Sequence, residues 1–143
     1  MGYGADGVLH YWANASGTVL GAPVRIGRGW NSLTLAMIDF DADGNQDLLA
    51  VDTSGAMRLY RSNGQQAFIA EPRKVVGAGW QSFRQYSGTT GIGGSGTTGL
   101  VAVQPSGLTY YYPVLPGGIW GARTQSAVLG SATTVSMTTP SKR

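Results

Sequence analysis

The chain has 143 residues, a net charge of +3, 23 glycines and no cysteine. Its length fits one domain with a moderate core, and the absence of cysteine excludes disulfides, thiolate metal sites and cysteine nucleophiles. Its 10 lysines and arginines are too dispersed for a nucleic-acid footprint. No apolar run reaches the roughly 18 residues of a membrane span, and the start lacks the basic and apolar regions of a signal peptide.

The composition favours an all-β fold. Glycine, valine, threonine and aromatic residues are abundant, whereas only 12% of the residues are charged. This mixture disfavours long helices and is typical of short strands joined by turns.

Three sequence patterns recur along the chain at a spacing of about 50 residues. Residues 7–12, 55–60 and 107–112 each have a turn glycine followed by an alternating strand that ends on a large aromatic residue. A Gly-x-Gly-Trp turn ends at Trp30 and again at Trp80. The predicted strand 47–51 is matched by residues 99–103. A period near 50 residues, with about four short strands in each unit, is typical of a β-propeller blade.

On this basis we expect about three four-stranded blades. The predicted units are a partial blade at 1–38, a blade at 39–90, a blade at 91–139 and a tail at 140–143. Strands are expected in the middle unit at 47–52, 56–61, 73–76 and 83–86, and in the third unit at 100–104, 108–112, 124–129 and 134–138. The first unit is expected to begin at its second strand, with no first strand of its own.

An isolated chain of this kind would leave open sheet edges, because a ring of blades normally needs at least four units. Three solutions remain open. Copies could join into a six-bladed ring, another chain could supply the remaining blades, or the chain could be a fragment of a longer polypeptide.

Four of the seven acidic residues lie in the segment 39–47. Carboxylates at alternate positions of a tight loop repel one another unless a hard cation neutralises them, and Gly44 stands where a calcium loop turns sharply. The predicted Ca²⁺ ligands are the side chains of Asp39, Asp41, Asp43 and Asp47 and the carbonyl of Asn45. An EF-hand is excluded, because it needs a glutamate where Ala50 stands and helices on both sides. The alternative is a solvated acidic turn without metal.

Recurring aromatic residues are the candidates for ligand binding, because aromatic faces stack on sugar rings. Packing between neighbouring blades is the alternative, and it is favoured for Trp30 and Trp80. Tyr110 and Trp120 have no evident aromatic counterpart in the middle unit, which favours a specific contact. The candidate ligand-binding residues are His10, Trp12, Arg58, Tyr60, Tyr110, Tyr112 and Trp120.

Catalysis is not expected. A Ser-His-Asp arrangement would have to use His10, the single histidine, and no Gly-x-Ser-x-Gly elbow is present. A carboxylate pair for glycoside cleavage would have to come from Asp6, Asp52 and Glu71, which are widely separated in repeat position.

The segment 38–49, followed by Ser-Gly, Leu-Tyr, Ser-Asn-Gly and Gly-Ala-Gly-Trp, resembles the FG-GAP or VCBS-type repeat. That repeat builds β-propellers in integrin α-subunit heads, in propeller lectins and in modules of secreted bacterial hydrolases. The resemblance implies calcium binding by the acidic loop and an extracellular setting. The third unit departs from the pattern, because Gly91, Gly93 and Ser95 stand where the first three aspartates would. One Ca²⁺ per chain, with a structural role, is therefore expected.

Two functions remain after this sequence analysis. The first is a non-catalytic, calcium-stabilised module that recognises carbohydrate or another cell-wall or extracellular ligand. The alternative is a protein interaction or assembly module, as a fragment or subunit of a larger secreted protein, whose open edge accepts a partner strand.

Overall fold

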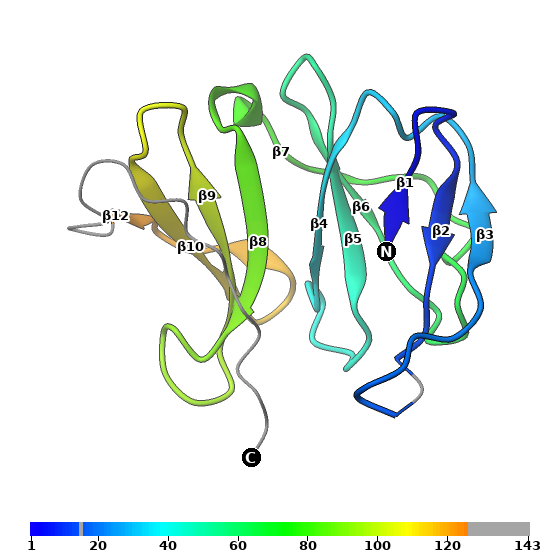
Figure 1. Ribbon diagram of the computed structural model, residues 1–143. Coiled ribbons are helices and arrows are strands. Elements are labelled where there is room, and N and C mark those ends of the chain that lie inside the picture. The colour runs from blue at the N-terminus through cyan, green and yellow to red at the C-terminus, as the bar shows by residue number, and fades with distance from the viewer. Residues whose placement is uncertain (15, 126–143) are drawn as a thin grey trace.

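The computed structural model describes residues 1–14 and 16–125, and this part of the chain is all-β, with three antiparallel sheets (Figure 1). The first sheet contains β1 (Gly2–Tyr3), β2 (Leu9–Tyr11) and β3 (Val24–Gly27). The second contains β4 (Thr34–Ile38), β5 (Asp47–Val51), β6 (Met57–Tyr60) and β7 (Val75–Gly77). The third contains β8 (Gln85–Thr90), β9 (Thr98–Val103), β10 (Thr109–Leu115) and β11 (Ile119–Trp120), and β12 (Thr124–Gln125) also pairs with β10.

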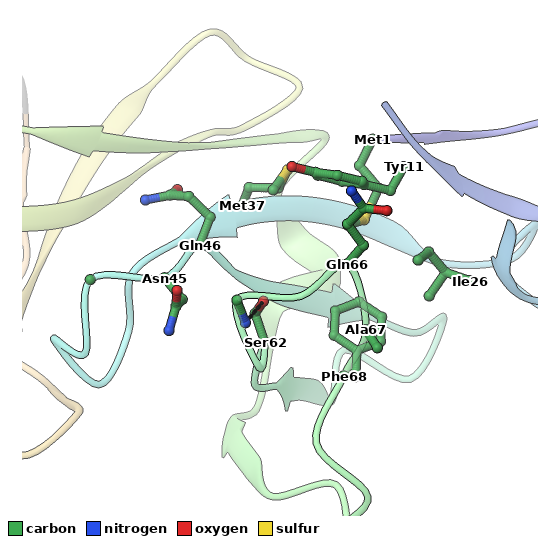
Figure 2. Close-up of a pocket in the computed structure, with 12 residues that line it drawn as sticks. Met1, Tyr11, Ile26, Met37, Asn45, Gln46, Ser62, Gln66, Ala67 and Phe68 are labelled. Atoms are coloured by element: carbon green, nitrogen blue, oxygen red, sulfur yellow. Dashed lines mark hydrogen bonds between the residues drawn. The ribbon is translucent and has the colours of Figure 1, made fainter. Parts of the chain in front are cut away.

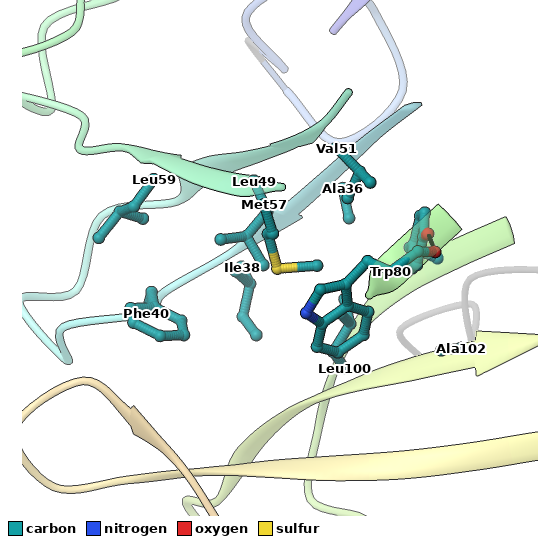
Figure 3. Packing of buried hydrophobic residues seen from close by; sticks show 11 residues of the cluster. Ala36, Ile38, Phe40, Leu49, Val51, Met57, Leu59, Trp80, Leu100 and Ala102 are labelled. Atoms are coloured by element: carbon teal, nitrogen blue, oxygen red, sulfur yellow. Dashed lines mark hydrogen bonds between the residues drawn. The ribbon is translucent and has the colours of Figure 1, made fainter. Parts of the chain in front are cut away.

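The second sheet lies between the other two and is covered on both faces (Figure 1). Its strand β5 is an uninterrupted run of buried residues, as expected for a strand without a solvent face. Leu48 and Ala50 pack towards the first sheet, with Leu9 and Trp30. Leu49 points to the other face of β5. It belongs to a larger hydrophobic core that lies towards the third sheet (Figure 3).

That larger core is closed by Trp80 and by a close approach of two strands. Trp80 begins a single-turn 3₁₀ helix, Trp80–Ser82, and is buried beside Met57 and Leu100 (Figure 3). At Gly88 a side chain would collide with the carbonyl oxygen of Met37, so β8 can approach β4 only because residue 88 is glycine. The second and third sheets are thus held together both by side-chain packing and by this backbone contact.

The same hydrogen bonds recur in the first and second sheets. The amide of Trp30 donates to the carbonyl of Gly7 over 3.1 Å, and that of Trp80 donates to Gly55 over the same distance. Both acceptor glycines have a positive φ, 69° and 84°, within tight turns that favour glycine. Each Gly-x-Gly-Trp turn is therefore fastened to the hairpin of its own sheet, which supports the structural interpretation of these tryptophans.

The strands are grouped differently from our prediction. Residues 83–86 were expected to complete the middle unit, but β8 pairs with β9 and belongs to the third sheet. The fourth strand of the second sheet is instead β4, which the prediction omitted. The predicted boundaries after residues 38 and 90 fall within the β4–β5 and β8–β9 hairpins.

The first unit also has a strand that was not expected, because β1 pairs with β2 through Gly2 and Tyr3. In the third unit, the predicted strand 124–129 is described only over β12, and the predicted strand 134–138 lies outside the described residues. Residues 1–14 and 16–125 form no closed ring, so the propeller remains a prediction. In the same ranges, no helix has the length and apolarity needed to cross a membrane.

Candidate functional site

The acidic segment 39–47 connects β4 to β5, and Asp47 anchors its end. The Asp47 side chain is fully buried. Its Oδ2 accepts a hydrogen bond from the amide of Phe40 over 3.1 Å, and its Oδ1 accepts one from the amide of Ser62 over 2.9 Å. Burial raises the pKa of the Asp47 carboxyl, against the opposing effect of these two amide donors. Asp47 thus joins the acidic loop to the segment that follows β6.

Three aspartates converge in the middle of the loop. Asp39, Asp41 and Asp43 each offer a carboxylate oxygen within 4.8 Å of the others. The backbone holds these groups in place: Asp39 accepts hydrogen bonds from the amides of Asp43 and Gly44, both over 3.1 Å. The positive φ of Gly44, 89°, turns the chain so that its amide points back towards Asp39.

Arg61 provides a positive charge beside this group. Its Nη1 lies 3.2 Å from Asp41 Oδ2, and its Nη2 lies 2.6 Å from Glu71 Oε2. The hydrogen bonds to Glu71 and Asp41 raise the pKa of Arg61, and the hydrogen bonds from Arg61 lower the pKa of Glu71. One arginine shared with Glu71 only partly compensates three neighbouring carboxylates.

The donor set fits a hard cation, because it consists of oxygens in a loop that the backbone already constrains. Of the five predicted ligands, the structure brings together Asp39, Asp41 and Asp43. Asp47 is not in this group, and both of its oxygens accept amide hydrogen bonds. The side-chain amide of Asn45 donates to Asp43 over 3.2 Å. Ligation by Asp47 and by the Asn45 carbonyl remains a prediction.

The acidic loop also forms one wall of a pocket of about 230 Å³ (Figure 2). Residues 44–46 contribute this wall, while the opposite walls come from the first sheet and from the segment after β6. Figure 2 shows Tyr11 reaching from the first sheet towards Met37 and Gln66. The lining residues are Met1, Tyr11, Ile26, Met37, Gly44, Asn45, Gln46, Ser62, Gly64, Gln66, Ala67 and Phe68.

The pocket is chemically mixed, and no charged side chain lines it. Tyr11 and Phe68 offer aromatic surface, and Gln46 and Gln66 offer amide groups that both donate and accept hydrogen bonds. This combination suits a small neutral ligand that has one apolar face and several hydroxyl or amide groups.

The seven side chains predicted to bind a ligand lie elsewhere, since none of them lines this pocket. Tyr60 packs on Trp30 at a centroid distance of 4.9 Å, with the guanidinium of Arg73 over its ring. Tyr112 packs on Trp80 at 4.7 Å. These contacts favour the packing interpretation for Tyr60 and Tyr112.

Trp120 and Tyr110 also take part in packing. Trp120 donates its indole N–H to the carbonyl of Val76 over 2.9 Å and lies 5.0 Å from the Phe40 ring. Tyr110 has Phe83 at 5.9 Å and the guanidinium of Arg123 over its ring at 4.6 Å.

The remaining candidates lie on the first and second sheets. His10 and Trp12 are partly exposed neighbours on the first sheet, with ring centroids 5.8 Å apart. Arg58 is engaged within the second sheet, where its Nη1 lies 2.5 Å from Asp52 Oδ2.

The sequence prediction missed Tyr11, Gln46, Gln66 and Phe68, which line the pocket. The available signal was the position of Gln46 within the predicted calcium loop, and of Gln66 and Phe68 shortly after a Ser-Asn-Gly turn. Comparisons with family models, with curated proteins and with solved structures gave no match for this chain.

Proposed function

We propose that this protein is a non-catalytic, calcium-stabilised binding module of the propeller type that recognises carbohydrate in an extracellular setting. One observation carries the proposal: the loop that gathers three carboxylates also forms a wall of a pocket that no charged side chain lines. The metal and the ligand would thus share one structural element.

Calcium is the cation proposed, because the site offers oxygens only and Ca²⁺ accepts six to eight of them at variable geometry. Asp39, Asp41 and Asp43 would hold the ion together with Asp47, the Asn45 carbonyl and water. Bound Ca²⁺ would neutralise the repulsion among these carboxylates. The extracellular setting is proposed from the resemblance of the acidic segment to FG-GAP or VCBS-type repeats. Extracellular calcium modules bind Ca²⁺ at about 0.1–1 mM, which suits calcium-rich fluid.

A saccharide is the ligand class proposed for the pocket. Its volume of about 230 Å³ lies below the roughly 300–1,000 Å³ of sites for drug-sized ligands. A single sugar unit has an apolar ring face for Tyr11 or Phe68 and hydroxyls for the amides of Gln46 and Gln66. Since no charged side chain lines the pocket, a ligand that needs a charged side chain as the partner of its own charge is disfavoured.

Thermal unfolding in chelator and in about 10 mM Ca²⁺ tests the metal. If the dissociation constant is about 0.1–1 mM, this concentration stabilises the fold by about 1.4–2.7 kcal/mol. Asp43→Asn should remove most of this stabilisation, because it deletes a charge from the group of three. Asp6→Asn, outside the loop, is the matched control. The calcium proposal is rejected if Ca²⁺ leaves the wild-type unfolding temperature unchanged.

Glycan-array binding tests the pocket. Gln66→Ala should weaken binding at least about ten-fold, since it removes a polar contact worth roughly 1.4 kcal/mol or more. The matched control is Gln65→Ala, because Gln65 neighbours Gln66 but does not line the pocket. Chelation should weaken the same binding, since residues 44–46 belong to the acidic loop. If Ca²⁺ stabilises the protein but no glycan on the array binds, the calcium proposal stands and the saccharide proposal is rejected.

A second candidate, an interaction or assembly module, is favoured by a separate observation. The connection between β2 and β3 exposes the apolar side chains of Val19 and Leu20, at 61% and 65%. Such side chains are unremarkable singly but mark contact surfaces when they lie together.

A further inference from the structure

A group of three aromatic side chains fills the junction between the first and second sheets. Trp30 lies at the end of the first sheet and packs against Tyr60 at 4.9 Å and Phe68 at 6.0 Å. Tyr60 and Phe68 are themselves 5.5 Å apart. The junction therefore consists of one tryptophan from one sheet and a pair of aromatic residues from the next.

The junction between the second and third sheets has the same construction. Trp80 packs against Tyr112 at 4.7 Å and Trp120 at 5.5 Å, and these two rings are 6.2 Å apart. Trp120 thus has an aromatic counterpart in the second sheet, Phe68, contrary to our sequence-based expectation. Because a tryptophan packs on two aromatic side chains at both junctions, we infer that neighbouring sheets of this fold join through this contact.

The first sheet has residues at the two positions that pack against the tryptophan in such a junction. Trp12 holds the place that Tyr60 holds in the second sheet, and Leu20 holds that of Phe68. The bridge between Asn14 and Leu20 matches the one between Ser62 and Phe68. Across residues 1–14 and 16–125, the single aromatic ring paired with Trp12 is that of His10. By this correspondence Trp12 and Leu20 hold the two positions that meet a tryptophan in the other junctions, and no tryptophan ring pairs with Trp12 in the described structure.

The third sheet carries the apolar sheet surface of the opposite half of the junction, although its described residues place no tryptophan there. Leu100 and Ala102 are fully buried towards the second sheet, so Val101 and Val103 point to the other face, because successive side chains alternate along a strand. Tyr111 shares this outward face, being paired in register with Val101. All three are half-buried.

The counterparts of these residues in the second sheet are Leu49, Val51 and Leu59. These side chains are buried at the junction with the third sheet. The outward face of the third sheet thus corresponds to a face that, one sheet earlier, is a contact surface.

We propose that the first sheet, through Trp12 and Leu20, docks on the outward face of the third sheet of a second copy of this chain. The occupant is a second copy because the outward face of the third sheet corresponds to the face with which the second sheet packs on its neighbour, and Trp12 and Leu20 hold the positions of the aromatic pair that such a face meets. Burial of these apolar side chains would drive the association. The contact joins two different surfaces, so it either closes a ring of copies or propagates into a filament. It is independent of the calcium loop and of the pocket.

Sedimentation velocity from micromolar to millimolar concentration, on the full chain of 14.9 kDa, tests this docking. The wild type should sediment as a particle of several chain masses. Leu20→Glu should lower the fraction assembled at a given concentration at least about ten-fold, because it places a charge in the apolar contact. Leu20 is 65% exposed, so the variant should keep the wild-type unfolding temperature. The matched control is Val75→Glu, at a β7 residue that is 52% exposed.

Mixing two variants distinguishes this head-to-tail contact from a symmetric one. Val103→Glu should also prevent assembly, because it alters the other face. An equimolar mixture of Leu20→Glu and Val103→Glu should regain one junction and form a two-chain particle, since each retains the face that the other lacks. A wild-type particle of one chain mass would overturn the proposal. So would assembly that survives Leu20→Glu, or assembly lost with Leu20→Glu but kept with Val103→Glu.

Discussion

The β4–β5 and β8–β9 hairpins occupy corresponding places in neighbouring sheets, yet their loops differ in amino-acid composition. The first loop holds four aspartates in nine residues. The second consists mainly of glycine, with no acidic residue between 90 and 98. Each leads into the buried central strand of its sheet, so both must satisfy their backbone groups at the same position in the fold.

The glycine loop achieves this with its own backbone. Gly91 donates to Thr97 over 2.8 Å, and Gly94 donates to Gly91 over 3.2 Å. The Thr97 hydroxyl adds a hydrogen bond to the Gly94 carbonyl over 2.7 Å. None of these bonds requires a charged group, and none brings like charges together.

The acidic loop satisfies its amides with carboxylates instead. Asp39, Asp43 and Asp47 accept hydrogen bonds from the loop and its surroundings. Charge-assisted bonds of this kind are stronger, but they leave neighbouring negative charges that repel. The comparison teaches that one hairpin position can be closed with or without carboxylate acceptors. The third sheet thus provides an internal control for the proposed calcium site.

The largest expected effect comes from Asp47→Ala. This change leaves the buried amides of Phe40 and Ser62 without their acceptor, which should cost about 2–4 kcal/mol of unfolding free energy. Gly99 holds the corresponding position in the third sheet and has no side chain to remove. The neighbouring Thr98→Ala is therefore the control, and it should cost less than about 1 kcal/mol. Urea unfolding of both variants measures the difference. Equal losses would show that Asp47 does not anchor its hairpin in the way the hydrogen bonds indicate.

The sequence predicted the all-β class and the acidic loop because both depend on local signals. Composition reports strand preference, and alternating aspartates around Gly44 report a turn that collects oxygens. The grouping of strands into sheets was beyond the sequence. Residues 85–90 follow the Trp80 turn in the chain, but their partner is β9, and local order does not specify which sheet a strand will join.

The pocket was not predicted because its walls come from segments that meet only in the folded chain. Tyr11, Met37 and Phe68 are far apart in the sequence and belong to no common motif. The aromatic residues were recognised as recurrent, yet recurrence alone does not distinguish packing from ligand binding. Contacts such as that of Trp80 with Tyr112 favour packing.

Substitution of one glycine in each loop compares the backbone strain of the acidic loop with that of the glycine loop. Gly44 and Gly94 both have positive φ, 89° and 118°, and an added Cβ would meet nothing within 4 Å at either position. Alanine should therefore cost about 1–2 kcal/mol in each loop through backbone strain alone, with the larger loss at Gly94. Gly21→Ala, where φ is not positive, is the control and should change stability by less than about 1 kcal/mol. Thermal unfolding of the three variants in chelator checks this order.

Arg61→Gln should separate the role of the arginine from that of a metal. Arg61 lies 3.2 Å from Asp41 and would repel a cation bound there. Its removal should raise the Ca²⁺ affinity about three- to ten-fold at low salt, and the gain should shrink at high salt. Isothermal titration with Ca²⁺ at two salt concentrations measures both effects. An unchanged affinity would place the ion away from Asp41.

The smallest effect concerns the opposite end of the second sheet, where Asp52 and its third-sheet counterpart Gln104 repeat the contrast between charged and neutral turns. Both residues accept a turn hydrogen bond from a glycine amide over 2.9 Å. Hydrogen bonds from Ser54 and Arg58 lower the pKa of Asp52 to about 2, from an ordinary 3.8. Because the folded-state pKa is the lower one, Asp52 stabilises the fold above about pH 4, and this contribution is lost as the pH falls towards 2.

Urea unfolding at about pH 5 and about pH 2.5 should therefore show a smaller loss of stability for Asp52→Asn than for the wild type. Carbon-detected NMR titration gives the carboxyl pKa directly. Ser54→Ala should raise it more than Arg58→Gln does, because the Ser54 hydroxyl is the larger cause of the shift. A wild-type midpoint at the ordinary 3.8 would contradict the hydrogen bonds assigned to Asp52. In that case the acidic turn would gain nothing over the neutral turn at Gln104, and charge would matter only in the loop proposed to hold calcium.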